Sequence, residues 1–323
     1  MVITTPFFAE LKKTFPRTNV DVLCSPANQS VLRNNPNVTS RIIWTPSLLG
    51  LRLLWQLRNR YDLVIDLNHS VIWRDILMIR FLNPIWAAST FKAGRYGVTG
   101  SELSIYRLMP RSECAWTESI AGKYLNLIES LGGSPNQKFR YDIYLEDDLS
   151  RQVPADTVLS SLKSDFWVVN QYGGRDSMCL TDEDVRAVTA LIRRHDPQAF
   201  VLWASSPSTY QASVRKREDW FSDDDHVVVY RPTQQAIDIC NYLRRAKGLI
   251  SPDTSLIHLA CAFEKPMVVV FADERHLYKQ WKPPLTNWQA HLFSKDSKSL
   301  KGYSSRELFQ ATDELIELKS RTV

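Results

Sequence analysis

The sequence predicts an α/β protein of two domains, each an open and mostly parallel sheet wrapped by helices. Helical patterns and short apolar strands alternate along the chain with short connections between them. A chain of 323 residues with 44% hydrophobic content can also bury two cores of ordinary domain size. Between the halves, Glu146–Asp165 is rich in charge and serine and contains Pro154. We therefore expect domains at 1–150 and 166–323, with a linker at 151–165.

The first half begins with a helix, because Phe7, Phe8, Leu11 and Phe15 form a helical stripe and Pro6 suits a first helical turn. The same periodicity predicts the later helices, and short apolar runs predict the strands. The helices are expected near Phe7–Thr14, Ala27–Asn34, Leu48–Asn59, Ile72–Leu82 and Glu113–Leu131. The strands are expected near Val20–Cys24, Ile42–Trp44, Leu63–Leu67 and Ala87–Lys92, with an exit strand at Tyr141–Leu145.

The second half restarts the alternation and ends in a helix. Its predicted elements are strand Phe166–Asn170, helix Asp182–Arg194, strands Ala199–Ala204 and Val227–Val229, and helix Thr233–Ala246. The stretch Leu249–Phe271 follows as strand, loop, helix, loop and strand. A final helix over Ser304–Leu318, capped by Ser304 or Ser305, is expected to pack back on the first domain.

The polar residues at the first junction of Leu249–Phe271 mark a candidate phosphate site. Pro252 ends the strand, and Asp253, Thr254 and Ser255 supply capping oxygens for an apolar helix. The N–H groups and positive dipole end of that helix favour an anion such as a pyrophosphate, and His258 lies in its first turn. The alternative is an ordinary N-cap beside a structural histidine.

The net charge and the cysteines argue against nucleic acid binding and against a metal site. The net charge of +5 lies mainly in residues 1–150 and is too small, with too few arginine–aromatic clusters, to indicate nucleic acid binding. It suits a half that meets an anionic acceptor near an anionic membrane face. The cysteines are scattered without metal-ligand spacing, so we expect reduced thiols of a cytoplasmic protein and no metal site. They are Cys24, Cys114, Cys179, Cys240 and Cys261.

Neither a signal peptide nor a membrane-spanning helix is predicted. No charged-then-apolar leader opens the chain. The most apolar long run, Val71–Phe91, is interrupted by Arg74, Asp75 and Arg80.

The segment Ala246–Phe271 closely resembles the donor-binding segment of glycosyltransferase family 9, the lipopolysaccharide heptosyltransferases. In that family an Asp-Thr-small-x-x-His motif holds the diphosphate of ADP-heptose, which implies donor contacts for Asp253, Thr254, Ser255 and His258. Blocks similar in order and spacing are Thr4–Leu23, Tyr61–Asn68 and Trp167–Val185. The resemblance implies a GT-B fold, in which two Rossmann-like domains face each other across a cleft.

Further donor contacts are expected after other strands of the second domain, where open α/β sheets bind ligands. Gly173 and Gly174 allow close backbone approach, and Arg175 offers a charged fork for phosphate oxygens. A simple glycine turn with a surface arginine is the alternative. In the family this loop carries a basic residue that stabilises the leaving nucleotide, and Arg175 is the nearest match. Ser205, Ser206 and Thr233 lie where the family contacts ribose and adenine, although each is also an ordinary loop hydroxyl or helix cap.

The acceptor is expected on the side of the first domain. His69 and Arg74 follow the strand that ends near Leu67, and we assign both to the acceptor side. Asp66 lies inside the same apolar strand, where a carboxylate either pairs with a neighbouring loop or faces the cleft. We favour structural pairing for Asp66.

The start of the chain departs from the family pattern. Family members begin with a central strand and a Gly-Asp loop whose Asp is the proposed general base, whereas Met1–Pro6 aligns just after that loop. We therefore expect a gap in the first sheet beside Val20–Cys24 and Leu63–Leu67. The catalytic base is left unassigned, with His69 as a possible substitute.

The function hypothesis is an inverting, metal-independent and cofactor-free transfer of heptose from ADP-heptose to the lipopolysaccharide inner core. Helix dipole and arginine would stabilise the departing diphosphate. The partners are a nucleotide-sugar donor and an anionic glycolipid acceptor, with peripheral contact at the inner membrane. One alternative is a catalytically silent nucleotide-sugar-binding protein, and another is a related transferase with a different donor or acceptor. A Rossmann oxidoreductase is disfavoured because no Gly-x-Gly-x-x-Gly follows any predicted strand.

Overall fold

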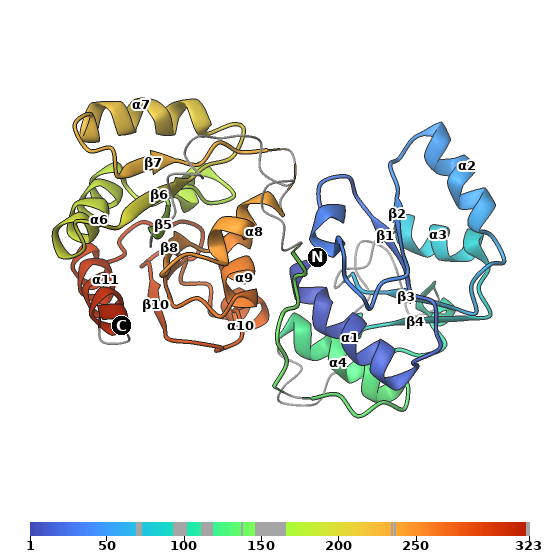
Figure 1. Cartoon of the computed structure of the whole chain (residues 1–323). Coiled ribbons are helices and arrows are strands. Elements are labelled where there is room, and N and C mark those ends of the chain that lie inside the picture. The colour runs from blue at the N-terminus through green and yellow to red at the C-terminus, as the bar shows by residue number, and fades with distance from the viewer. Residues whose placement is uncertain are drawn as a thin grey trace. The chain divides into compact units, whose positions relative to one another are not determined.

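The computed structural model of the chain divides into two compact units. The first comprises Met1–Asp142 with Lys279–Trp281, and the second comprises Ile143–Tyr278 with Lys282–Val323 (Figure 1). The structure describes residues 1–68, 73–92, 102–110, 119–136, 138–145, 166–233, 235 and 237–320. The linker predicted at 151–165 lies outside these residues.

The first unit alternates helices with short parallel strands. Its longer elements are α1 (Thr5–Thr14), β1 (Asp21–Cys24), β2 (Ser40–Ile43), α2 (Leu48–Leu57), β3 (Leu63–Asp66), α3 (Trp73–Leu82), β4 (Trp86–Ser89) and α4 (Ile120–Ser130). Short 3-10 helices cover Val2–Thr4, Gln29–Leu32 and Glu102–Ile105. Serine caps fix the starts of two helices, since Ser47 accepts a hydrogen bond from the Gly50 amide of α2 and Ser119 accepts one from the Gly122 amide of α4.

The described strands of the first unit form two separate two-stranded sheets. β1 pairs with β2, and β3 pairs with β4, all in parallel. Both sheets nevertheless contribute to one core with α1 and α4, through Val22 of β1, Ile65 of β3 and Ala88 of β4. The Tyr61 hydroxyl donates a hydrogen bond to the Asp21 carboxylate at 3.0 Å. In the described part of the chain the ladder is thus broken between β1 and β3, as expected.

Two predictions in the first unit are wrong. The segment Tyr141–Leu145 is not a strand, because the Asp142 amide donates to the Thr5 hydroxyl at 2.8 Å instead of to a ladder. The helix predicted at Ala27–Asn34 is a single 3-10 turn that stops before Asn34, which takes a positive φ of 59°. Of the helix predicted at Glu113–Leu131, residues 113–118 lie outside the described part, and α4 begins at Ile120.

The second unit is a six-stranded parallel sheet covered by helices on both faces (Figure 1). The strand order is β10-β9-β8-β5-β6-β7. The strands are β5 (Phe166–Asn170), β6 (Phe200–Ala204), β7 (Val227–Val229), β8 (Leu249–Pro252), β9 (Met267–Phe271) and β10 (Gln289–Phe293). The helices are α6 (Asp182–His195), α7 (Tyr210–Phe221), α8 (Asp238–Leu243), α9 (Ser255–Ala262), α10 (Arg275–Trp281) and α11 (Ser305–Ser320), with a 3-10 turn at Asp176–Met178.

The final helix belongs to the core of the second unit. Leu308 and Leu315 of α11 are fully buried in the same cluster as Val188 and Ile192 of α6 and Trp167 of β5. Its apolar face therefore packs on its own sheet, and its packing on the first domain stays a prediction.

Three elements of the second unit were not predicted. In α7 only Ser213 is buried, in α10 no residue is buried, and the residues of edge strand β10 are all partly exposed. Hydrophobic periodicity is the main sequence signal for such elements, so its absence explains these omissions. The predicted helix Thr233–Ala246 is shorter in the structure and covers Asp238–Leu243 as α8, while positions 234 and 236 lie outside the described residues.

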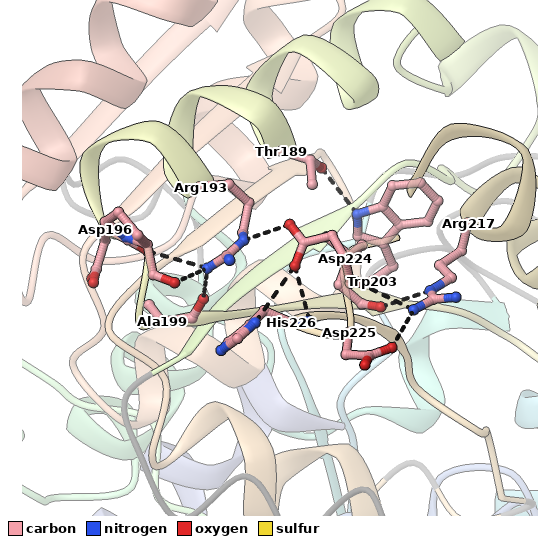
Figure 2. A network of polar contacts seen from close by, with 11 residues as sticks. Thr189, Arg193, Asp196, Ala199, Trp203, Arg217, Asp224, Asp225 and His226 are labelled. Carbon is pink, nitrogen blue, oxygen red and sulfur yellow. Dashed lines mark hydrogen bonds and ion pairs between the residues drawn. The ribbon is translucent and has the colours of Figure 1, made fainter. Parts of the chain in front are cut away.

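An arginine network ties together the loops at the amino ends of β6 and β7 (Figure 2). Arg193 Nε donates to the Asp224 carboxylate at 2.7 Å, and Arg193 Nη1 donates to the carbonyls of Pro197 and Ala199 at 2.6 and 2.8 Å. Arg217 binds the Val227 and Asp224 carbonyls from the other side at 2.9 and 3.1 Å. The guanidinium of Arg193 alone thus satisfies several acceptors in loops, where the backbone has no partner in a helix or a sheet.

Removing the guanidinium of Arg193 should destabilise the second unit. We expect Arg193→Ala to lower the free energy of unfolding by about 2 kcal/mol at pH 7 in urea denaturation, because partly buried acceptors lose a charged donor. Burial by itself raises the pKa of Asp224, but the hydrogen bond from Arg193 outweighs it and holds that pKa below its usual value. The stabilisation is therefore complete above about pH 4 and is lost as the pH falls through the lowered pKa. Arg194→Ala, on the same helix but exposed, is the matched control, and equal losses in both variants would contradict the network's role.

Candidate functional site

The strand order of the second unit reverses between β5 and β8. From β5 the chain continues outward to β6 and β7, whereas β8, β9 and β10 lie on the other side. In open α/β sheets such a switch point forms a crevice at the carboxyl ends of the strands, where ligands bind. The two motifs singled out in the sequence lie there, since the loop with Gly173 follows β5 and Asp253 follows β8.

The start of α9 presents a helix N-terminus at this edge of the sheet. Thr254 is the N-cap, and its hydroxyl accepts a hydrogen bond from the Leu256 amide at 3.2 Å. Asp253 is held in place because its amide donates to the Val270 carbonyl of β9 at 3.0 Å. Ser255, the first helical residue, is exposed, while Asp253 and Thr254 are half-buried. The positive dipole end of the helix favours an anion here.

Asn170 joins the end of β5 to the start of α9. Its buried amide donates to the Ser251 hydroxyl of β8 at 3.0 Å and to the Tyr172 carbonyl at 3.1 Å, and it accepts from the Tyr172 amide at 3.2 Å. The structure therefore brings the loop after β5 and the residues before α9 together at one edge of the sheet. We did not assign Asn170 a role from the sequence, although a polar residue closing an otherwise apolar strand was the available signal.

The two glycines after β5 differ in their surroundings. A Cβ on Gly173 would lie 2.2 Å from the Met178 carbonyl oxygen, so this position needs glycine for packing of the turn. A Cβ on Gly174 would meet no atom within 4 Å. Arg175 is exposed and precedes the 3-10 turn Asp176–Met178. Its contact with a phosphate stays a prediction.

Lys216 is a further cation at this edge that we did not single out from the sequence. Its ammonium donates to Gln171 Oε1 at 3.1 Å and to the Asp182 carboxylate at 2.5 Å. It also lies 5.5 Å from the centre of the Tyr172 ring. Lys216 lies on α7, a helix that we did not predict from the sequence, and so we did not consider this residue. It positions the segment that leads from β5 into the glycine loop.

Burial drives both titratable residues of the α9 motif toward their neutral forms. His258 is 7% exposed, and burial lowers its pKa to about 4, so its imidazole is neutral at pH 7. Burial raises the pKa of Asp253 to about 6. His258 can therefore exchange hydrogen bonds with a ligand but brings no positive charge. That the α9 helix end and Arg175 attract an anion stays a prediction.

The remaining hydroxyl candidates make local hydrogen bonds. Ser205 donates to the Tyr230 carbonyl at 2.5 Å, and the Ser206 hydroxyl lies 3.0 Å from that of Thr209 at the start of α7. Thr233 donates to the Asp238 carboxylate at 2.5 Å. These residues follow β6 and β7, so they lie at the same edge of the sheet as α9's N-terminus, and their nucleotide contacts stay predictions.

On the acceptor side, His69 lies outside the described residues. Arg74 is exposed, and its guanidinium binds the Asp75 carboxylate at 3.1 Å and lies 5.6 Å from the Trp44 ring centre. Asp66 is paired as favoured from the sequence. It contacts the fully buried Lys92 ammonium at 3.2 Å and accepts a hydrogen bond from Tyr106 at 2.6 Å.

The raised pKa of Asp253 generates a stability prediction. A carboxyl whose pKa is raised on folding destabilises the folded state once the pH passes the unfolded value, and the cost is complete above the folded value of about 6. We expect Asp253→Asn to raise the unfolding free energy by about 1 to 2 kcal/mol at pH 7.5, with a smaller gain at pH 5. Thermal melting across this range measures it. Asp223→Asn, at an exposed loop, is the control and should be neutral; a pH-independent gain at Asp253 would contradict the burial argument.

Comparison with solved structures supports the two-unit α/β architecture. A glycosyltransferase family 9 protein from Veillonella parvula DSM 2008 aligns with a TM-score of 0.78 at 16% identity, covering 98% of this chain and 93% of that one. ADP-heptose lipopolysaccharide heptosyltransferase II of E. coli gives 0.76 at 13% identity, with coverages of 99% and 96%. E. coli heptosyltransferase WaaC with ADP gives 0.72 at 16% identity, with coverages of 97% and 95%.

Sequence comparison identifies the family. No curated protein matches the chain. The model of glycosyltransferase family 9 (heptosyltransferase) matches residues 51–307, which includes most of both units and the whole α9 motif. The chain therefore belongs to glycosyltransferase family 9 and has the GT-B fold of two Rossmann-like α/β domains.

Proposed function

We propose that this transferase uses ADP-heptose as donor and transfers heptose, with inversion, to an inner-core acceptor of lipopolysaccharide. The observation that carries the proposal is the N-terminus of α9, with Asp253, Thr254, Ser255 and His258, at the switch point between β5 and β8. E. coli WaaC, a structural neighbour, was solved with ADP. A diphosphate suits this edge because helix amides and an arginine can share its charge.

The chemistry of an inverting transfer explains why these groups matter. The acceptor hydroxyl loses a proton while the sugar passes through an oxocarbenium-like transition state and the nucleoside diphosphate departs. Fixed donors aimed at the departing charge lower that barrier, and they do so best where the site excludes water. The α9 amides and Arg175 supply this stabilisation in our proposal. Neutral His258 adds a hydrogen bond and no charge. In our proposal the helix dipole and Arg175 stabilise the departing diphosphate without a metal or a cofactor.

A catalytically silent nucleotide-sugar-binding protein is the second candidate. It is favoured by one observation: Asp66, the carboxylate at the end of β3, is buried and bound by Lys92 and Tyr106, so it serves a structural pairing. His69 is the substitute base in the active alternative. A related transferase with another donor or acceptor would share the same α9 site. An anionic glycolipid acceptor would place the protein at the cytoplasmic face of the inner membrane.

Donor binding is the direct test of the proposed site. We expect Arg175→Ala and His258→Ala each to weaken ADP binding about tenfold in calorimetry, since a hydrogen bond to a charged group contributes about 1.5 to 3 kcal/mol. Arg186→Ala, an exposed arginine on α6, is the matched control. Because His258 is buried, His258→Asn is measured beside the alanine variant, with melting curves for both. Unchanged affinity in all three site variants would remove these roles.

Turnover separates the two candidate functions. Labelled ADP-heptose with a heptose-deficient core acceptor should give labelled product if the protein is a transferase. Donor binding without product would favour the silent binding protein. His69→Ala should abolish transfer and leave ADP affinity within twofold if His69 is the base, because a base acts on the acceptor hydroxyl.

A further inference from the structure

The helix α2 carries apolar side chains on two opposite faces. Leu54 and Leu57 are buried against Leu82 of α3, which is the ordinary core-facing stripe. On the other face Leu48, Leu51 and Trp55 follow a spacing of three and four residues and are 85, 61 and 68% exposed. Folding of the first unit does not use this second stripe. Exposed apolar area of this extent marks a surface that meets something else.

Helix α3 extends the exposed area. Leu77 and Phe81 lie one turn apart on its outer face and are both exposed, whereas Ile76 and Ile79 are buried. The guanidinium of Arg58, directly after α2, lies 5.8 Å from the centre of the Phe81 ring. The end of α2 therefore lies beside the outer face of α3. We call this area the α2–α3 surface and define it by Leu48, Leu49, Leu51, Trp55, Leu77 and Phe81.

Exposed arginines predominate around the α2–α3 surface, with exposed Asp62 two residues beyond Arg60. Residues 40–60 contain Arg41, Arg52, Arg58 and Arg60 and no acidic residue, and all four arginines are exposed. Arg80 of α3 is exposed as well, whereas Asp75 on the same helix is buried and bound by Arg74. An apolar area with an excess of exposed arginines matches a partner that offers both apolar contact and negative charge.

We infer that the α2–α3 surface docks the protein on an anionic lipid bilayer. Leucine and tryptophan side chains would enter the boundary between headgroups and acyl chains, and the arginines would contact phosphate headgroups. A second copy meeting this surface face to face would bring arginines against arginines, and nucleic acid offers little for exposed leucines. No helix in the described part of the chain is long and apolar enough to cross a bilayer.

This inference deepens the proposed function, because it names the surface that would bring the enzyme to a lipid-linked acceptor. The lipid-docking inference rests on the proposed transferase function only for the identity of the acceptor, since lipid binding requires neither donor nor turnover. Experiments can therefore contradict the docking inference and the proposed function independently.

Vesicle co-sedimentation tests the surface with phosphatidylcholine vesicles, with and without phosphatidylglycerol. We expect the full chain to bind the anionic vesicles strongly and the neutral ones weakly, with binding reduced at high salt. The double variant Leu49→Ser with Trp55→Ser should lose at least tenfold in partitioning, because two of the inserted side chains are removed. Arg52→Ala should lose about fivefold on anionic vesicles only.

Two exposed residues outside the surface provide matched controls. Leu285→Ser changes a leucine that is 79% exposed, and Arg186→Ala changes an exposed arginine; both should bind vesicles like the parent chain. ADP calorimetry on the double variant should be unchanged, which separates lipid docking from the donor site. The inference is overturned if the parent chain ignores anionic vesicles, or if Leu285→Ser weakens binding as much as the double variant. A dimer by ultracentrifugation that only the double variant loses, without vesicle binding, would instead assign the surface to self-association.

Discussion

The parallel pairing of β5 with β8 is the constraint on which the donor site depends. The register sets Val168 opposite Leu249 and Val169 opposite Ile250, so the next residues, Asn170 and Ser251, meet at the edge of the sheet. From there one strand leads into the glycine loop and the other into the cap of α9. The glycine loop and the start of α9 are far apart in sequence, and the pairing of β5 with β8 brings them together. A shift of the register by one residue would turn Asn170 away from Ser251 and separate the two loops.

Burial at this edge acts against charge on the side chains of the α9 motif. His258 is neutral at pH 7, whereas Asp253, with a pKa of about 6, is largely ionised there, so the dipole of α9 is the favourable electrostatic element for an anion. A ligand anion therefore meets dipoles that need no proton exchange to attract it. The unfavourable ionisation of Asp253 is typical of positions kept for function at the expense of stability.

The sequence was sufficient to predict elements with a strong apolar period and insufficient for those without one. The stripe of α1, the mainly apolar strands β5 and β9 and the capped start of α9 agree with prediction to within a few residues. By contrast, α7 and β10 bury too few side chains to give a hydrophobic periodicity in the sequence. Because α7 was not predicted, Lys216 was not recognised as a residue near the site. The Asp253–His258 motif could be placed at a helix start from capping chemistry alone. The link from this motif to β5 through Asn170 could not be predicted, because strand order is a property of the folded sheet.

The break between β1 and β3 sets how the first unit responds to force and to solvent. Two-stranded ribbons have little stability of their own, so here the helices α1 and α4, rather than a continuous ladder, keep the strands in place. Each ribbon can then tilt as a piece without rupturing backbone hydrogen bonds in the other. Amide exchange should consequently be faster throughout β1–β4 than in the central strands of the second unit, and the two halves of the chain should behave as a compliant body and a stiff one.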